Sequence, residues 1–188
     1  MKYILWLLII LIILPSSAIA FYKPLRLVLP ETFGMHCNEL NICVDDIKQL
    51  DAATSLATSA KENLLTQHGL SVGNPKAIFC STNKCKETFG LSKVGGLAFG
   101  SFAVAVAPRG WKEHYVAHEL IHHWQATHFG SLVLITGEQW LIEGMAYALS
   151  DDPRETLSQP FESYRQQFRE WYKSRTSAPL EQAIAEML

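Results

Sequence analysis

The chain has 188 residues, of which 48% are hydrophobic and 18% charged, and its formal net charge at pH 7 is −2. Its 16 Lys and Arg residues stand against 18 Asp and Glu residues and form no continuous run. A nearly balanced charge without a basic cluster gives no electrostatic support to nucleic acid or anionic lipid as a partner, so we predict neither.

The N-terminal segment has the three parts of a secretory signal peptide. A lysine precedes the apolar run Ile4–Leu14, and small residues follow, ending in Ala18-Ile19-Ala20. The run is shorter than the roughly 20 apolar residues that a reliable transmembrane helix needs. We therefore predict that residues 1–20 are a cleaved signal peptide of an exported, periplasmic or extracellular protein, with an uncleaved membrane anchor as the alternative. Residues 21–188 suffice for one domain.

The cysteines agree with export, because an even number in a secreted chain usually forms disulfides. The chain contains four, as two close pairs: Cys37 with Cys43, and Cys80 with Cys85. Three connectivities are possible. We favour pairing within each close pair, because such short loops can close without distorting the rest. A zinc ion held by all four cysteines is the alternative, although neither pair has the usual two-residue spacing.

Strand and helix patterns alternate in the first half of the domain. The apolar segment Leu25–Leu29 is predicted to be a strand. A long helix is predicted from an N-cap at Asp45 or Asp46 to about His68, because its apolar residues recur near helical spacing. Lys76–Cys80 is predicted to be a second, short strand.

The second half begins with Leu97–Ala107, which is rich in Ala, Val and Phe and is predicted to be a further strand with Gly100 as a bulge. A helix from about Gly110 to His128 should follow directly. The predicted order is strand, helix, strand, strand and then helices, which indicates an α+β fold.

His118-Glu119-Leu120-Ile121-His122 is the most informative segment of the chain. Residues four apart stack on one face of a helix, so both imidazoles can reach one metal ion while Glu119 lies beside them. Downstream, the helical segment Trp140–Ala146 contains Glu143 as a third ligand. Two histidines and one glutamate leave the fourth position of a zinc ion open, as a catalytic zinc site requires.

These two segments together resemble the gluzincin branch of the zinc metallopeptidases, in which one helix carries HExxH and a second carries Trp-x-x-Glu-Gly-x-Ala. The resemblance implies a zincin-like fold, with a small mixed sheet packed on the zinc-binding helix and a mostly helical C-terminal part. It implies one Zn²⁺ held by His118, His122 and Glu143. Glu119 would be the general base that takes a proton from the attacking water, and the substrate would be a peptide or protein.

In the resembled family the edge strand of the sheet pairs with an extended substrate. The unpaired N–H and C=O groups of such an edge hold a peptide irrespective of its sequence. Leu97–Ala107 is the candidate for this strand, and a buried core strand is the alternative.

Two departures from the family narrow the activity. No Gly-x-Met-Glu-Asn segment precedes the predicted zinc helix, which disfavours an aminopeptidase, and Tyr147 stands where thermolysin-like enzymes carry a carboxylate. We therefore predict a zinc-dependent endopeptidase. The alternative is an exported zinc-binding module without catalysis that binds a protein or peptide partner.

Tyr147 is also a candidate catalytic residue. It lies one helical turn after Glu143, so its phenol could stabilise the oxyanion that develops on the substrate, although a tyrosine packed in the core fits the same position. Tyr164 and Tyr172 are further candidates by residue type alone.

Other polar residues near the motif have less specific roles. Zinc-bound imidazoles usually donate their second N–H to a carboxylate or carbonyl, and Asp151 or Asp152 could accept it or could cap the helix end. His114 lies about 12 Å along the helix from the second histidine of the motif, too far to share its metal ion. Surface or capping roles are predicted for His123 and His128.

The C-terminal part contains aromatic residues at helical spacing and then a short apolar helix around Leu180–Leu188. This spacing predicts a helix packed on the core, with a substrate wall or a membrane-facing surface as the alternative. The aromatic residues are Phe161, Tyr164, Phe168, Trp171 and Tyr172.

Overall fold

The computed structural model describes residues 22–174 and 179–188, so the predicted signal peptide or anchor at 1–20 lies outside the described residues. No helix in the described ranges is long and apolar enough to cross a membrane. The elements in chain order are the 3₁₀ helices η1 (Lys23–Val28) and η2 (Pro30–Phe33), β1 (His36–Cys37), β2 (Ile42–Val44), η3 (Ile47–Gln49), α2 (Leu50–His68), β3 (Lys76–Phe79), α3 (Asn83–Thr88), β4 (Gly96–Phe99), β5 (Ala103–Val106), η4 (Pro108–Gly110), α4 (Glu113–Phe129), α5 (Val133–Thr136), α6 (Gln139–Leu149), α7 (Phe161–Lys173) and α8 (Leu180–Ala185).

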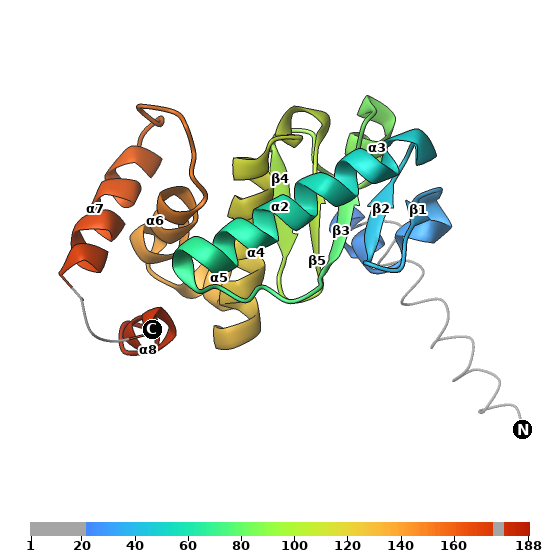
Figure 1. Ribbon diagram of the computed structural model, residues 1–188. Coiled ribbons are helices and arrows are strands. Elements are labelled where there is room, and N and C mark those ends of the chain that lie inside the picture. The colour runs from blue at the N-terminus through green and yellow to red at the C-terminus, as the bar shows by residue number, and fades with distance from the viewer. Residues whose placement is uncertain (1–21, 175–178) are drawn as a thin grey trace, which may run out of the picture.

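The strands form one mixed sheet in the order β1-β2-β3-β5-β4 (Figure 1). The neighbours β2 and β3, and β3 and β5, run parallel, whereas β1 and β4 run antiparallel to the strands they pair with. The α+β class and the small mixed sheet expected from the sequence are therefore confirmed. β4 lies at one edge of this sheet.

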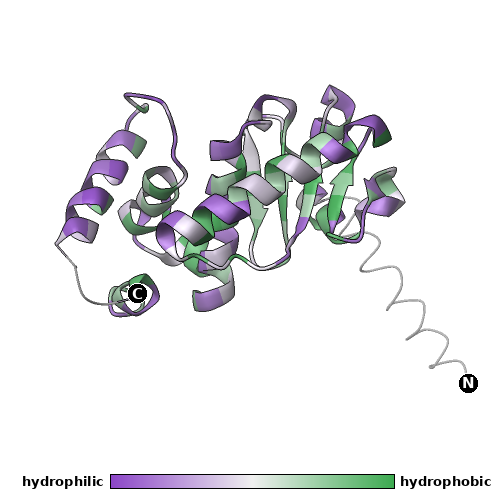
Figure 2. Ribbon diagram, in the orientation of Figure 1, coloured by the Kyte–Doolittle hydropathy of each residue, from purple (hydrophilic) through white to green (hydrophobic). Residues whose placement is uncertain are grey.

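Helices and 3₁₀ turns cover both faces of the sheet. Ile42, Phe79 and Val104 point to the face packed against α2 and α4, and their neighbours Cys43 and Ile78 point to the other face. Because both faces are buried, the central strands read as continuous apolar runs rather than as an alternation of apolar and polar residues. Figure 2 shows these strands in the hydrophobic colour.

The helices that position the site pack in sequence on one another. α4 packs on β4 and β5, α6 packs on α4, and α7 packs on α6. α6, α7 and α8 gather at the β4 end of the molecule, away from β1 (Figure 1). The predicted long helix is confirmed: the Asp46 side chain caps η3 by accepting from the Lys48 N–H, and α2 ends at Gly69 in the left-handed conformation.

The predicted strand Leu25–Leu29 is wrong, because Lys23–Val28 forms the 3₁₀ helix η1. A proline at the start of η1 fixes its own φ near −65°, which suits a helical turn. This turn buries Leu27 against Phe89 and Leu91 on the second face of the sheet. The apolar residues of this segment are therefore explained by burial of a helical turn and not by a strand.

The predicted single strand Leu97–Ala107 is also wrong, because the chain reverses within it. β4 and β5 form an antiparallel hairpin, in which Gly96 pairs with Val106. Gly100 has a φ of +55° in the connecting turn and is not a bulge. The turn is closed by the Phe102 N–H, which donates to the Phe99 carbonyl at 3.1 Å. Only the β4 half of the segment is therefore at the edge, and the β5 half lies inside the sheet.

The cysteines form the two local disulfides that the sequence favours. Cys37–Cys43 joins β1 to β2, and Cys80–Cys85 joins the end of β3 to α3. No cysteine is free, so the alternative of a zinc ion held by four cysteines is wrong. Two disulfides are consistent with an exported protein. The strands β1 and β2 and the helix α3 were not predicted.

Close contact between α6 and α7 explains the glycine of the second motif. A Cβ added at Gly144 would lie 2.4 Å from the Tyr164 carbonyl oxygen and 3.0 Å from Phe168 Cβ. Phe168 is fully buried, as the packed-helix interpretation of the aromatic stripe predicts, and the ring centroids of Trp140 and Trp171 lie 6.0 Å apart. Gly144 therefore lets α7 lie directly against the helix that carries Glu143.

Candidate metal centre and cleft

Three of the predicted site residues converge on one point. On α4, His118 and His122 lie one turn apart with their Nε2 atoms 3.1 Å from each other. On α6, Glu143 faces both, with one carboxylate oxygen 3.6 Å from His118 Nε2 and the other 3.6 Å from His122 Nε2. The three ligand atoms all lie within 4.8 Å of one another.

These separations suit a single zinc ion. Two nitrogen or oxygen ligands at about 2.0 to 2.1 Å from a tetrahedral zinc lie about 3.3 Å apart. The observed 3.1 and 3.6 Å bracket that value. The other candidate group, Glu31 with Cys37 and Cys43, contains the cysteines of a disulfide and offers no thiolate.

Gln125 fixes which ring nitrogen of His122 faces His118 and Glu143. Its amide nitrogen donates to the Ile142 carbonyl at 3.0 Å, so its oxygen is turned toward His122 Nδ1 at 2.8 Å. Nδ1 is therefore a donor, and Nε2 is the ring nitrogen that faces His118 and Glu143 and is placed to bind a metal ion. Gln125 is 1% exposed and thus held in this orientation. The partner of His122 is this amide, so the predicted choice of Asp151 or Asp152 is wrong for this ring.

The charges at the centre favour a cation. Burial opposes ionisation of Glu143, but hydrogen bonds and charge interactions with His118 and His122 outweigh it and hold the pKa of Glu143 well below its usual range. Burial likewise disfavours the charged form of His122, yet Glu143, Glu119 and Gln125 together raise its pKa to about 9. The carboxylates of Glu143 and Glu119 therefore stabilise a positive charge at the ring nitrogens, and a metal ion can supply this charge.

Glu119 lies beside the ligands, 7% exposed, between α4 and β4. Burial raises its pKa, and the nearby imidazoles and the Ala98 N–H oppose that rise only in part. A Cβ at Gly96 in β4 would lie 2.6 Å from Glu119 Oε1. The glycine therefore makes room for the carboxylate against the edge strand.

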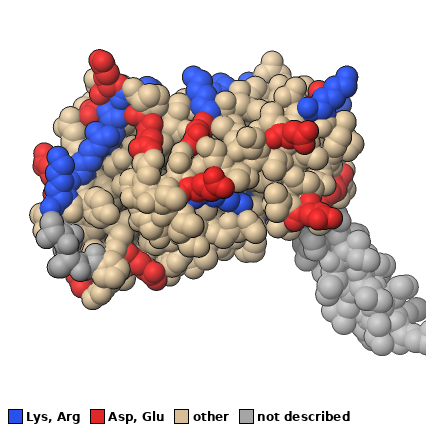
Figure 3. Space-filling view, viewed as in Figure 1, with Lys and Arg blue, Asp and Glu red and all other residues tan. Residues whose placement is uncertain are grey.

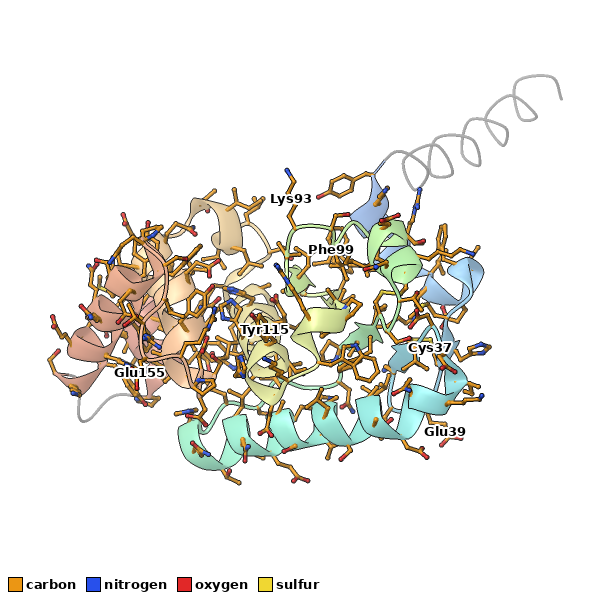
Figure 4. All side chains as sticks on the ribbon, turned by 90° about the horizontal axis from the view of Figure 1, so that it is seen from above. Cys37, Glu39, Lys93, Phe99, Tyr115 and Glu155 are labelled. Atoms are coloured by element: carbon orange, nitrogen blue, oxygen red, sulfur yellow. A yellow bond between two sulfur atoms is a disulfide. The ribbon has the colours of Figure 1, made fainter. Side chains whose placement is uncertain are left out.

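The centre opens into a cavity of about 890 Å³ between β4, α4, α5, α6 and the loop after α6. We call this cavity the cleft. Seen from above in Figure 4, Tyr115 of α4 lies between Glu155 on the loop after α6 and Lys93 and Phe99 on the β4 side. Glu119, His118, His122, Glu143 and Tyr147 all line the cleft.

Of the three candidate tyrosines, Tyr147 alone lines the cleft. Its ring centroid is 4.5 Å from that of His118. Burial, and next the charge of Glu143, raise the pKa of Tyr147 to about 12, so at neutral pH the phenol is protonated and able to donate a hydrogen bond. Tyr172 instead stacks on Phe168 at 5.7 Å, and Tyr164 packs against Phe161.

The remaining histidines stay outside the ligand set. His114 lines the cleft one turn before His118. His128 bonds the Trp124 carbonyl at 2.8 Å near the end of α4. His123 is buried beside Thr127, so its predicted surface or capping role is wrong.

Three residues that contact the candidate centre or line the cleft were not found by sequence reasoning. Gln125 lies three residues after His122, a helical spacing that could have indicated a contact. Gly96 and Arg154 gave no signal, since their roles depend on elements that meet only in three dimensions. Arg154 binds Asp152 on the loop after α6, with its Nε 2.8 and 3.0 Å from the two carboxylate oxygens.

Comparison of the chain with protein-family models, with curated proteins and with solved structures found no match in any of the three.

Proposed function

We propose that the protein is an exported zinc-dependent peptidase with a zincin-like fold, and that it acts as an endopeptidase. One observation supports this most directly. Two imidazoles and one carboxylate converge with metal-binding separations on an open cleft, and a buried glutamate lies next to them. Three protein ligands leave the fourth zinc position for water or substrate, whereas structural zinc sites are closed by four.

Each residue at the centre has a role in peptide hydrolysis. His118, His122 and Glu143 would hold the zinc ion, which when bound supplies a Lewis acid for the scissile carbonyl and lowers the pKa of water. Glu119 accepts the proton of the attacking water and passes it to the leaving amine; its raised pKa suits that transfer. Tyr147 donates a hydrogen bond to the developing oxyanion.

The position of β4 supports a peptide as the substrate. β4 is an edge strand, and its residue Gly96 contacts Glu119. An extended peptide can add to a free edge through main-chain hydrogen bonds, which brings its carbonyl groups past the centre. The lack of a Gly-x-Met-Glu-Asn segment favours cleavage within a chain over removal of N-terminal residues.

The test is zinc stoichiometry together with hydrolysis of a mixed peptide library by wild type, Glu119→Gln and Glu143→Ala. We expect one zinc and cleavage for wild type, one zinc without cleavage for Glu119→Gln, and loss of zinc retention for Glu143→Ala. Glu170→Gln, an exposed change on α7, is the matched control and should behave as wild type.

Other outcomes would redirect the proposal. Hydrolysis by Glu119→Gln at the wild-type rate would remove Glu119 as the base. One zinc without cleavage of any library member would favour the non-catalytic zinc-binding module. A wild-type protein that retains no zinc would refute the metal centre itself.

A further inference from the structure

The charges that line the cleft differ from those of the whole chain. Apart from the residues at the metal centre, the cleft is lined by Lys93, Arg109 and Arg154 and by one carboxylate, that of Asp152. The chain as a whole has a net charge of −2, and on the face seen in Figure 3 the Lys and Arg side chains are interspersed with Asp and Glu. A concave site lined by an excess of one charge attracts ligands of the opposite charge.

The two ends of the cleft differ in chemistry. Near the start of α4, Arg154 lies over the rings of Tyr115 and Tyr147, with its guanidinium carbon 5.7 and 5.8 Å from their centroids. At the other end, α5 and the residue before it present Leu132 and Ile135, which are 72% and 78% exposed. The metal centre lies between a basic end and an apolar end.

Arg154 is held rigidly yet keeps unused donors. Asp152, whose side chain is 2% exposed, binds the Nε and Nη2 edge of the guanidinium, whereas the Arg154 side chain is 44% exposed. Among residues 22–174 and 179–188, no hydrogen bond joins Arg154 Nη1 to any group. An arginine fixed in this way loses little conformational freedom when it binds a second carboxylate.

We propose that Arg154 binds a carboxylate of the peptide substrate, which makes it a specificity-determining residue. This inference rests on the proposed peptidase function. The ring of Tyr147 lies 4.5 Å from that of His118 and 5.8 Å from Arg154 Cζ. The guanidinium is thus within roughly 10 Å of a zinc ligand, about three residues of an extended peptide at 3.3 Å per residue. The carboxylate belongs to an Asp or Glu side chain or to the substrate C-terminus, within about three residues of the scissile bond.

The first test measures binding without turnover. Zinc-loaded Glu119→Gln protein is titrated by fluorescence anisotropy with labelled peptides that carry one Glu at successive positions, each beside its Gln twin. The same peptides are used with a free or an amidated C-terminus, which separates the two sources of the carboxylate. We expect the matching acidic peptide to bind about 10- to 100-fold more tightly than its neutral twin, as a charge-assisted hydrogen bond allows.

Variants assign this preference to Arg154. Arg154→Gln combined with Asp152→Asn removes both charges without leaving the buried Asp152 unpaired, and it should bring the acidic-to-neutral affinity ratio close to one. Arg154→Lys should retain part of the preference, since lysine offers a charge without the planar fork. Arg169→Gln, an exposed change on α7 outside the cleft, should leave the ratio unchanged.

The outcomes separate this inference from the proposed function. An unchanged acidic-to-neutral affinity ratio in the double variant, or an equal loss of affinity for acidic and neutral peptides, would overturn the proposed role of Arg154. Arg154 would then only stabilise the loop after α6 through Asp152. Hydrolysis of neutral peptides by wild type without any acidic preference would support the peptidase alone. A carboxylate preference in a protein that hydrolyses nothing would support the binding site and refute the peptidase.

Discussion

Gln125 links the candidate metal centre on α4 to α6, and its removal tests whether the site is built to bind zinc. In Gln125→Leu, His122 Nδ1 loses its acceptor at 2.8 Å, and α4 loses the hydrogen bond to the Ile142 carbonyl at 3.0 Å. Among the contacts described above, only those of Nε2 with His118 and Glu143 then orient the His122 ring. Removal of such an indirect partner typically weakens metal binding about 10- to 100-fold, which corresponds to about 1.4 to 2.7 kcal/mol.

The assay is zinc affinity by competition with a chromophoric chelator, at a temperature where urea titrations show each variant to be folded. Gln125→Glu keeps an acceptor for His122 but sets a carboxylate against the Ile142 carbonyl, so it should retain more zinc affinity than Gln125→Leu while losing stability. Gln166→Leu, which removes an exposed amide on α7, is the control. If folded Gln125→Leu binds zinc as tightly as wild type, the orientation of His122 by Gln125 is not needed, and our account of the centre is wrong.

Three further predictions follow from other contacts. Gly96→Ala would place a Cβ 2.5 Å from Glu119 Cγ and displace this carboxylate. We therefore expect kcat/KM for peptide hydrolysis to fall by about tenfold or more, while zinc content, measured in parallel, stays the same. Full activity would show that the base tolerates displacement. Asp45 accepts hydrogen bonds from Ser81 and Thr82; burial raises its pKa, but these bonds outweigh it, so the folded-state pKa is lowered. Asp45→Asn should therefore lower the free energy of unfolding by about 1 kcal/mol at neutral pH. In urea titrations this difference from wild type should be complete above about pH 4 and should shrink as the pH falls through the lowered pKa of Asp45. A difference independent of pH would show that the ionised Asp45 carboxylate does not stabilise the fold. Phe168→Ala should lower the unfolding free energy by about 3 to 5 kcal/mol, because the ring is fully buried between α6 and α7; a loss below about 1 kcal/mol in urea titration would contradict that packing.

Much of the candidate centre could be predicted because it depends on local geometry. The i, i+4 spacing of His118 and His122 places them on one face whenever the segment is helical. Gly69 marks the end of α2 by the same local reasoning. Short cysteine loops likewise restrict the pairing to near neighbours, and Cys80–Cys85 is an example.

The incorrect predictions concern segments whose apolar residues are buried for reasons outside the segment. Leu27 is buried by a 3₁₀ turn against the far face of the sheet, and a short apolar run cannot distinguish such a turn from a strand. The strands β4 and β5 are both apolar although the chain reverses between them. The reason is that one face of this hairpin packs against α4 and the other face packs in the second core cluster. Gly100 and Ser101 were the residues of the 97–107 segment able to indicate a turn.

The sequence by itself determined that a helical segment would place His118, His122 and Glu119 together, since this follows from spacing along one element. It also favoured the local disulfides, since the cysteines of each pair are only a few residues apart. The family resemblance predicted that Glu143 joins both histidines, but only tertiary structure decided the distances between them. Tertiary structure alone decided that Gln125 is fixed by a carbonyl of α6 and that Arg154 reaches the cleft from the loop after α6. These contacts join elements far apart in the chain, and their distances are set by how α4, α6 and the edge of the sheet pack. No periodicity within a single element encodes that packing.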